Sequence, residues 1–157
     1  PPSDVLRRTN RHLLPKLQQQ RMMVTMLYGI LDIREHTLTF SNAGQGYPLL
    51  CYNGESQYLE NSGIPLGGFE QPMYDDCTIP IPPDATLVLY SDGFIEMVGA
   101  NGELLGFDRF QQMVIQYAHL PVPQMVERLL DTAIRFGDKR FERDDLTLVI
   151  IKRTGGR

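Results

Sequence analysis

In the stretch LVLYSDGFIEMV (residues 87–98), an acidic residue closely follows an apolar run. Residues 87–90 are continuously apolar, which predicts a buried strand over 86–91. Asp92 follows that strand, and a carboxylate there is costly to desolvate unless a cation or several donors meet it. Gly93 comes next and suits a backbone that turns sharply beside a ligand. The stretch therefore predicts a strand whose acidic end needs a partner.

A second acidic site occurs near the end of the chain, where Asp144 and Asp145 open the apolar run LTLVII (146–151). If strands 86–91 and 146–151 are neighbours in one sheet, their ends can converge. Two carboxylates a few ångströms apart would then form an oxygen-ligand site for Mg²⁺ or Mn²⁺. For each site taken singly, the simpler interpretation is a turn at Asp92 and a loop cap at Asp144.

Composition limits the partners and the compartment. The chain has 157 residues, 42% hydrophobic and 22% charged, which predicts a single domain over residues 1–157. Its net charge of −4 predicts neither a nucleic-acid nor a membrane partner. No long apolar segment and no signal-peptide core is present, so we expect a cytoplasmic protein. Cys51 and Cys77 lie outside any Cys-x-x-Cys pattern and are expected to be buried, reduced thiols.

The first half of the chain predicts one helix followed by strands. The helix starts with Ser3 as its N-cap and should end near Pro15. The apolar segment 22–33 is continuous enough to predict a buried strand, paired as a hairpin with 36–42. An Asn-Gly dipeptide between two alternating runs predicts a second hairpin over 47–60.

The second half predicts one more strand pair and two helices. A strand at 75–81 ends in a proline cluster, which should place it at a sheet edge. Apolar residues then recur at helical spacing over 107–117 and again over 122–134. The segment 146–151 returns to strand character. This order predicts an α+β domain with helices packed on a sheet.

Five motifs resemble, in order and spacing, the SpoIIE/RsbU branch of the PPM (type 2C) metal-dependent Ser/Thr protein phosphatases. They cover nearly the whole chain from Thr25 onward and read TMLYGILD (25–32), SNAGQGYP (41–48), GIPLGG (63–68), LVLYSDGFIE (87–96) and RDDLTLVIIK (143–152). The resemblance implies an αββα sandwich of two mainly antiparallel sheets flanked by helices.

The same resemblance implies a site and a reaction. It places metal-binding, catalytic aspartates on Asp92 and Asp144, with Gly93 and Asp145 as their immediate neighbours at the metals. Two Mn²⁺ or Mg²⁺ ions would activate a water that hydrolyses phosphoserine or phosphothreonine. No cysteine or serine nucleophile is then required.

Partners are likewise implied by the resemblance alone. The substrate would be a phosphorylated regulatory protein of the anti-sigma-factor-antagonist type, within signal transduction or a two-component system, and the phosphatase could be a homodimer. The alternative is a catalytically weak or inactive phosphatase-like domain that binds a regulatory protein. A third possibility is a structural β-rich scaffold.

The chain departs from the family pattern at two points. Relatives carry an aspartate in a Gly-Asp strand and another in an Asp-x-Ser-Gly-His-Gly turn, and neither occurs before Thr25. The resemblance thus indicates the C-terminal portion of a domain that is incomplete at its N-terminus, and such a fragment is expected to lack full activity. Gln45 stands where relatives usually have histidine, and glutamine cannot exchange a proton near neutral pH.

Overall fold

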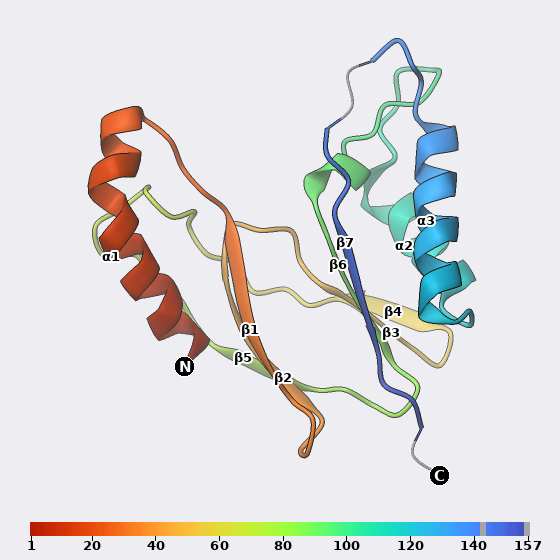
Figure 1. Ribbon diagram of the computed structural model, residues 1–157, viewed down its shortest axis with the longest axis horizontal. Helices are drawn as coiled ribbons and strands as arrows, with labels where there is room; N and C mark the ends of the chain where they lie inside the picture. Colours follow the sequence, from red (N-terminus) through yellow and green to blue (C-terminus); the bar gives the residue numbers. More distant parts are fainter. Residues whose placement is uncertain (142–143, 156–157) are drawn as a thin grey trace. The chain divides into compact units, whose positions relative to one another are not determined.

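The computed structural model describes residues 1–141 and 144–155. The chain divides into two compact units, Pro1–Gln45 with Glu60–Pro82, and Gly46–Leu59 with Pro83–Arg157. Each unit holds one antiparallel sheet and its own helices (Figure 1). The fold class is therefore α+β with two antiparallel sheets flanked by helices, as predicted. No helix among the described residues is both long and apolar enough to cross a bilayer.

The first unit packs one helix against a sheet of three strands in the order β1-β2-β5. Its elements are α1 (Pro2–Gln20), β1 (Met26–Asp32), β2 (Thr37–Ala43) and β5 (Cys77–Pro80). The β1–β2 hairpin and the edge position of β5 confirm two sequence predictions. Leu6 and Leu17 of α1 are buried with Ala43 of β2 in the core of this unit.

Helix α1 is longer than predicted and has a different N-cap. It runs through Pro15 to Gln20, and Arg21 ends it in the left-handed conformation with φ 53°. Proline removes one N–H but keeps a helical φ, and the buried Leu17 anchors the last turn. Pro1 occupies the N-cap, while the N–H and hydroxyl of Ser3 donate to the Asp76 carboxylate at 2.7 and 2.9 Å. The predicted end at Pro15 and cap at Ser3 are therefore wrong.

Strand β1 is not the buried strand that its apolar sequence predicted. It lies at the edge of its sheet, and its last four residues are exposed. Ile30 remains 50% exposed, and Ile33, just beyond the strand, 76%. An apolar run does not reveal whether a second layer covers it, so the strand could be predicted but its exposure could not.

The second unit contains a four-stranded antiparallel sheet in the order β4-β3-β6-β7. Its elements are β3 (Leu49–Tyr52), β4 (Glu55–Tyr58), β6 (Thr86–Tyr90), the 3₁₀ helix η1 (Asp92–Phe94), α2 (Gly106–Tyr117), α3 (Val122–Phe136) and β7 (Leu148–Lys152). The turn between β3 and β4 has φ 53° at Asn53 and 78° at Gly54, which confirms the predicted hairpin. Both predicted helices are present.

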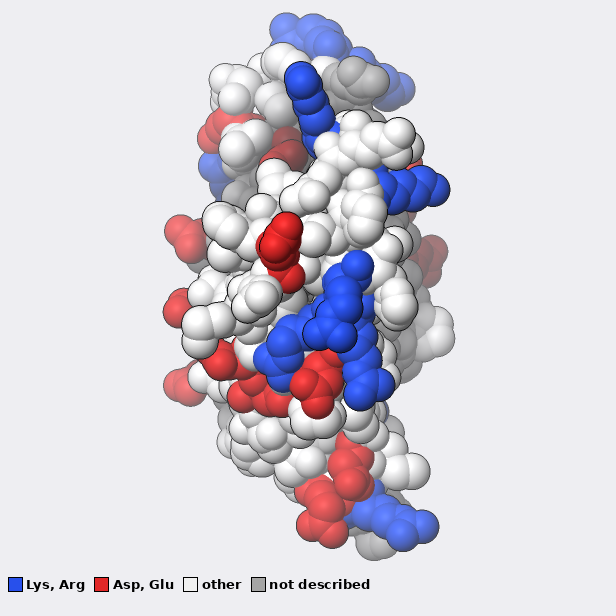
Figure 2. Space-filling model, turned by 90° about the vertical axis from the view of Figure 1, so that its left-hand side faces the viewer, with Lys and Arg blue, Asp and Glu red and all other residues white. Residues whose placement is uncertain are grey.

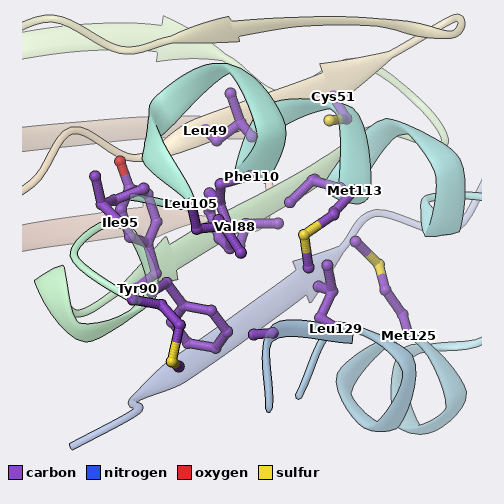
Figure 3. Close-up of a cluster of buried hydrophobic side chains, with 14 residues drawn as sticks. Leu49, Cys51, Val88, Tyr90, Ile95, Leu105, Phe110, Met113, Met125 and Leu129 are labelled. Carbon is purple, nitrogen blue, oxygen red and sulfur yellow. The ribbon is translucent and has the colours of Figure 1, made fainter. Parts of the chain in front are cut away.

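Helices α2 and α3 bury their apolar faces against this sheet (Figure 3). Val88 of β6 contacts this core together with Phe110 of α2 and Leu129 of α3, all three fully buried. The rings of Tyr90 and Phe110 lie 4.5 Å apart. The end of β6 is thus fixed by the core just before its acidic residue.

Candidate metal centre

The two acid-bearing strand ends lie side by side in the second unit. Strands β6 and β7 pair antiparallel with Tyr90 opposite Leu148, which places the end of β6 beside the start of β7. The pairing continues past both strands, because the Ser91 N–H donates to the Thr147 carbonyl at 3.0 Å. This confirms the strand adjacency on which the predicted site depends.

Beyond this bond, the Ser91 hydroxyl takes the place of the backbone groups that would continue the pairing of the two strands. It donates to the Asp145 carbonyl at 2.8 Å and accepts the Thr147 N–H at 2.9 Å. One side chain therefore holds the backbone on either side of Leu146 against the segment that leads into Asp92. Sequence reasoning missed this role, because the Ser91 hydroxyl bonds to residues 54 and 56 positions away in the sequence.

Gly93 is required by close packing rather than by an observed ligand. It is buried, and a Cβ added there would lie 2.6 Å from the Asp145 carbonyl oxygen and 3.2 Å from Leu146 Cδ2. Any larger residue would push η1 away from the segment that precedes β7. Glycine thereby keeps the backbones beside Asp92 and Asp145 in contact.

The side chains of Asp92, Asp144 and Asp145 are all exposed. Asp92 begins η1, past the last buried residue of the strand, and Asp144 Oδ1 accepts the Asp145 N–H at 2.8 Å. The predicted desolvation cost is therefore wrong, because water reaches these carboxylates even though Gly93 and Phe94, next to Asp92, are buried. A cation is not needed to make these acids tolerable.

The exposed carboxylates provide part of the ligand set that a hard divalent cation needs. They lie where β6 ends and β7 begins, a region termed the sheet edge here, and they offer oxygen ligands. Mg²⁺ commonly combines one or two carboxylates with several waters. Asp92 and Asp144 would be the ligands in this edge, with Asp145 and the Gly93 backbone next to them. Among residues 1–141 and 144–155, however, no three His, Cys, Asp or Glu side chains form a metal-binding group. Arg143, the first residue of the terminal motif, lies outside the described residues.

Gln45 sits in a fixed turn in the first unit. The buried Asn42 donates from Nδ2 to the Gln45 carbonyl and accepts the Gln45 N–H at Oδ1, both at 2.8 Å. Thr25 Oγ1 donates to Gln45 Oε1 at 2.8 Å. The backbone turn therefore depends on Asn42, and Thr25 orients the Gln45 side chain; neither contact was predicted from the sequence.

Comparison with known proteins gives a match over almost the entire chain. The family model described as Stage II sporulation protein E (SpoIIE) matches residues 1–154. Protein IcfG of Synechocystis sp. is 22% identical over 152 residues, which is 96% of this chain and 24% of IcfG. The chain thus spans about a quarter of the length of this curated relative.

Solved structures share the fold. The SiaA-PP2C domain of Pseudomonas aeruginosa superposes with a TM-score of 0.85 at 24% identity, covering 96% of this chain and 60% of that one. The RsbU and RsbW domains of Rv1364c from Mycobacterium tuberculosis give a TM-score of 0.68 at 23% identity, covering 85% of this chain and 37% of that one. These likenesses show that the fold is that of PP2C-type phosphatase domains.

Proposed function

Because the chain belongs to the SpoIIE family, we propose that it is part of a metal-dependent phosphatase of the PPM type that hydrolyses phosphoserine or phosphothreonine on a protein. The observation that carries this proposal is the pairing of β6 with β7. It brings the segment that holds Asp92 next to the segment that holds Asp144 and Asp145. Carboxylates close together at the ends of paired strands are the kind of oxygen donors that a divalent cation binds.

The residues at the sheet edge would have two roles, binding of the cation and positioning of the backbone. Asp92 and Asp144 would bind the cation through carboxylate oxygens, while Ser91 and Gly93 hold their backbones in place. The bound cation would supply Lewis-acid chemistry, which lowers the pKa of a coordinated water and neutralises phosphate charge. Solvent exposure of the carboxylates leaves the edge open to water and to a phosphorylated side chain.

The proposal also covers the identity of the cation, the substrate, the compartment and the oligomeric state. The cation would be Mn²⁺ or Mg²⁺, with two ions in the complete domain. The substrate would be a phosphorylated regulatory protein, such as an anti-sigma-factor antagonist, acted on in the cytoplasm by a phosphatase that could be a homodimer. Family membership supports this, and one solved structure of the same fold contains RsbU and RsbW domains.

The alternative is a phosphatase-like module that binds a regulatory protein without hydrolysing it. Two observations favour it. Gln45 cannot transfer a proton as histidine does, and the described residues contain no group of three metal-ligating side chains. Under this alternative, a cation at the sheet edge would have no catalytic consequence.

Metal titration and turnover separate the two functions. Calorimetry with Mn²⁺ and hydrolysis of p-nitrophenyl phosphate should be measured on the longest natural form of the protein. Asp92→Asn and Asp144→Asn should each weaken Mn²⁺ binding by about tenfold or more and abolish turnover. Glu127→Gln, an exposed acid on α3, should change neither. Metal-dependent turnover that survives both aspartate variants would refute the proposed site. Binding without turnover in the unaltered protein would favour the module.

A further inference from the structure

Helix α1 presents a basic face in a chain that is acidic overall. The helix carries Arg7, Arg8, Arg11 and Lys16 against the single acid Asp4, whereas the whole chain has a net charge of −4. Figure 2 shows Lys and Arg side chains gathered over α1, with acidic side chains nearby. The first unit thus concentrates four basic residues on one helix.

A cleft of about 460 Å³ opens beside this basic face. It lies between α1 and the loop that precedes β5, and it is lined by Arg7, Arg11, Leu14, Glu70, Gln71 and Pro72. Its volume falls within the range of about 300–1,000 Å³ that is usual for ligand sites. The cleft combines cationic groups with apolar carbon, because Leu14 and Pro72 contribute to its walls.

Hydrogen bonds from α1 fix the loop at both ends of this cleft. The fully buried Asn10 accepts the Gly67 N–H at 2.8 Å and donates to the Phe69 carbonyl at 2.9 Å. Arg7 Nη1 donates to the Tyr74 carbonyl at 3.0 Å. The walls are therefore already in place before any partner arrives, which lowers the entropic cost of binding.

Arg8 and Arg11 of α1 form no ion pair among the described residues, and Arg11 lines the cleft. Arg7 is paired with Asp4, but in residues 1–141 and 144–155 no ion pair involves Arg8 or Arg11. Their guanidinium groups can therefore accept a carboxylate from outside, a geometry that arginine favours. The loop adds apolar anchors, since the side chains of Phe69 and Met73 are 60% and 84% exposed.

We propose that α1 and loop 69–73 form a docking surface for an acidic segment of a partner protein that carries at least one apolar side chain. Carboxylates would contact Arg8 and Arg11, while the apolar side chain would pack on Phe69. A long polyanion fits less well, because Glu70 lines the same cleft and the chain as a whole is negative. This docking does not depend on hydrolysis at the sheet edge.

The test uses a defined probe and the full chain. A fluorescein-labelled peptide with six glutamates around one phenylalanine is titrated by fluorescence anisotropy. Arg8→Glu and Arg11→Glu together should weaken its binding about tenfold, because two attractive contacts become repulsive. Phe69→Ser should also weaken binding while leaving the charge unchanged. Circular dichroism of each variant confirms that the fold is intact.

Matched controls decide between local docking and general charge attraction. Lys139→Glu, a change at an exposed residue of the second unit, should leave binding unchanged. A peptide in which serine replaces the phenylalanine should bind the unaltered chain more weakly. An equal effect of Lys139→Glu would overturn the proposal. It would also be overturned if only vesicles with anionic lipid bound through Arg8 and Arg11, or if those residues instead supported self-association in sedimentation experiments.

Discussion

Ser91 and Thr147 are joined in both directions, because the Ser91 N–H donates to the Thr147 carbonyl and the Ser91 hydroxyl accepts the Thr147 N–H. These residues stand 56 positions apart in the sequence. Their pairing carries the β6–β7 ladder beyond the strands and up to the acidic edge. The positions of Asp92 and Asp144 therefore depend on a serine that is itself neither acidic nor a proposed ligand.

Replacing Ser91 with alanine should loosen this edge. The substitution removes the hydroxyl bonds to Asp145 and Thr147, and we expect the free energy of unfolding to fall by about 1–2 kcal/mol. Mn²⁺ affinity should fall as well. Urea denaturation and calorimetry measure the two effects, and Ser91→Thr, which keeps the hydroxyl, should preserve most of both. Unchanged metal affinity in Ser91→Ala would show that the hydroxyl does not position the acids.

Gln45→His should raise phosphatase turnover if proton transfer at this position assists the reaction. The Asn42 side chain bonds to the Gln45 backbone, so the turn should survive the change of side chain. Histidine titrates near pH 6.5, and the variant should gain a pH dependence in that region that Gln45 lacks. Rates of p-nitrophenyl phosphate hydrolysis between pH 5.5 and 8.5 give the comparison. Parallel pH profiles for both proteins would argue against a proton-transfer role.

The two cysteines should differ in reactivity towards a thiol reagent. Burial raises the pKa of the Cys51 thiol to about 11 despite its hydrogen bond with Ser56, so little thiolate exists at pH 8. Cys77 is only half-buried, contrary to the prediction that both thiols are buried, and should react first. Titration with a disulfide reagent should give one fast phase, lost in Cys77→Ser, and a second phase only in denaturant. A fast phase that persists in Cys77→Ser would contradict this assignment.

The β1–β2 hairpin should contribute a pH-dependent stability. Asp32 Oδ1 accepts the N–H groups of Glu35 and Arg34, which lowers the pKa of Asp32 below its ordinary value of 3.8. A lowered pKa means that this stabilisation is complete above the unfolded-state pKa and is lost as the pH falls through the folded-state pKa. The difference in melting temperature between the unaltered chain and Asp32→Ala should therefore be constant from pH 7 to 5 and shrink below about pH 4. A difference that grows on acidification would contradict the cause assigned here.

Much of the fold could be predicted from local signals. The Asn53-Gly54 turn specified its hairpin, and helical spacing specified α2 and α3, because these patterns depend on neighbouring residues. The end of α1 could not be predicted, since the packing of Leu17 overrides the usual effect of Pro15. The exposure of β1 could not be predicted either, because it depends on which other parts of the protein cover the strand.

The candidate site was predictable in its residues but not in its environment. Motif resemblance pointed to Asp92 and Asp144, and the apolar runs suggested that their strands pair. Their exposure was missed, because the sequence does not show that Asp92 is exposed at the start of η1 while its neighbours Gly93 and Phe94 are buried. The Ser91 hydroxyl bonds join segments far apart in the chain, which no local pattern reveals.

The contact between Gly93 and the Asp145 backbone has a mechanical consequence. With no room for even a methyl group between them, η1 and the residues that lead into β7 are in direct backbone contact. We therefore expect a displacement of η1 to move the residues that lead into β7. A fluorine label on the start of β7 should therefore report events at Asp92 without touching that residue.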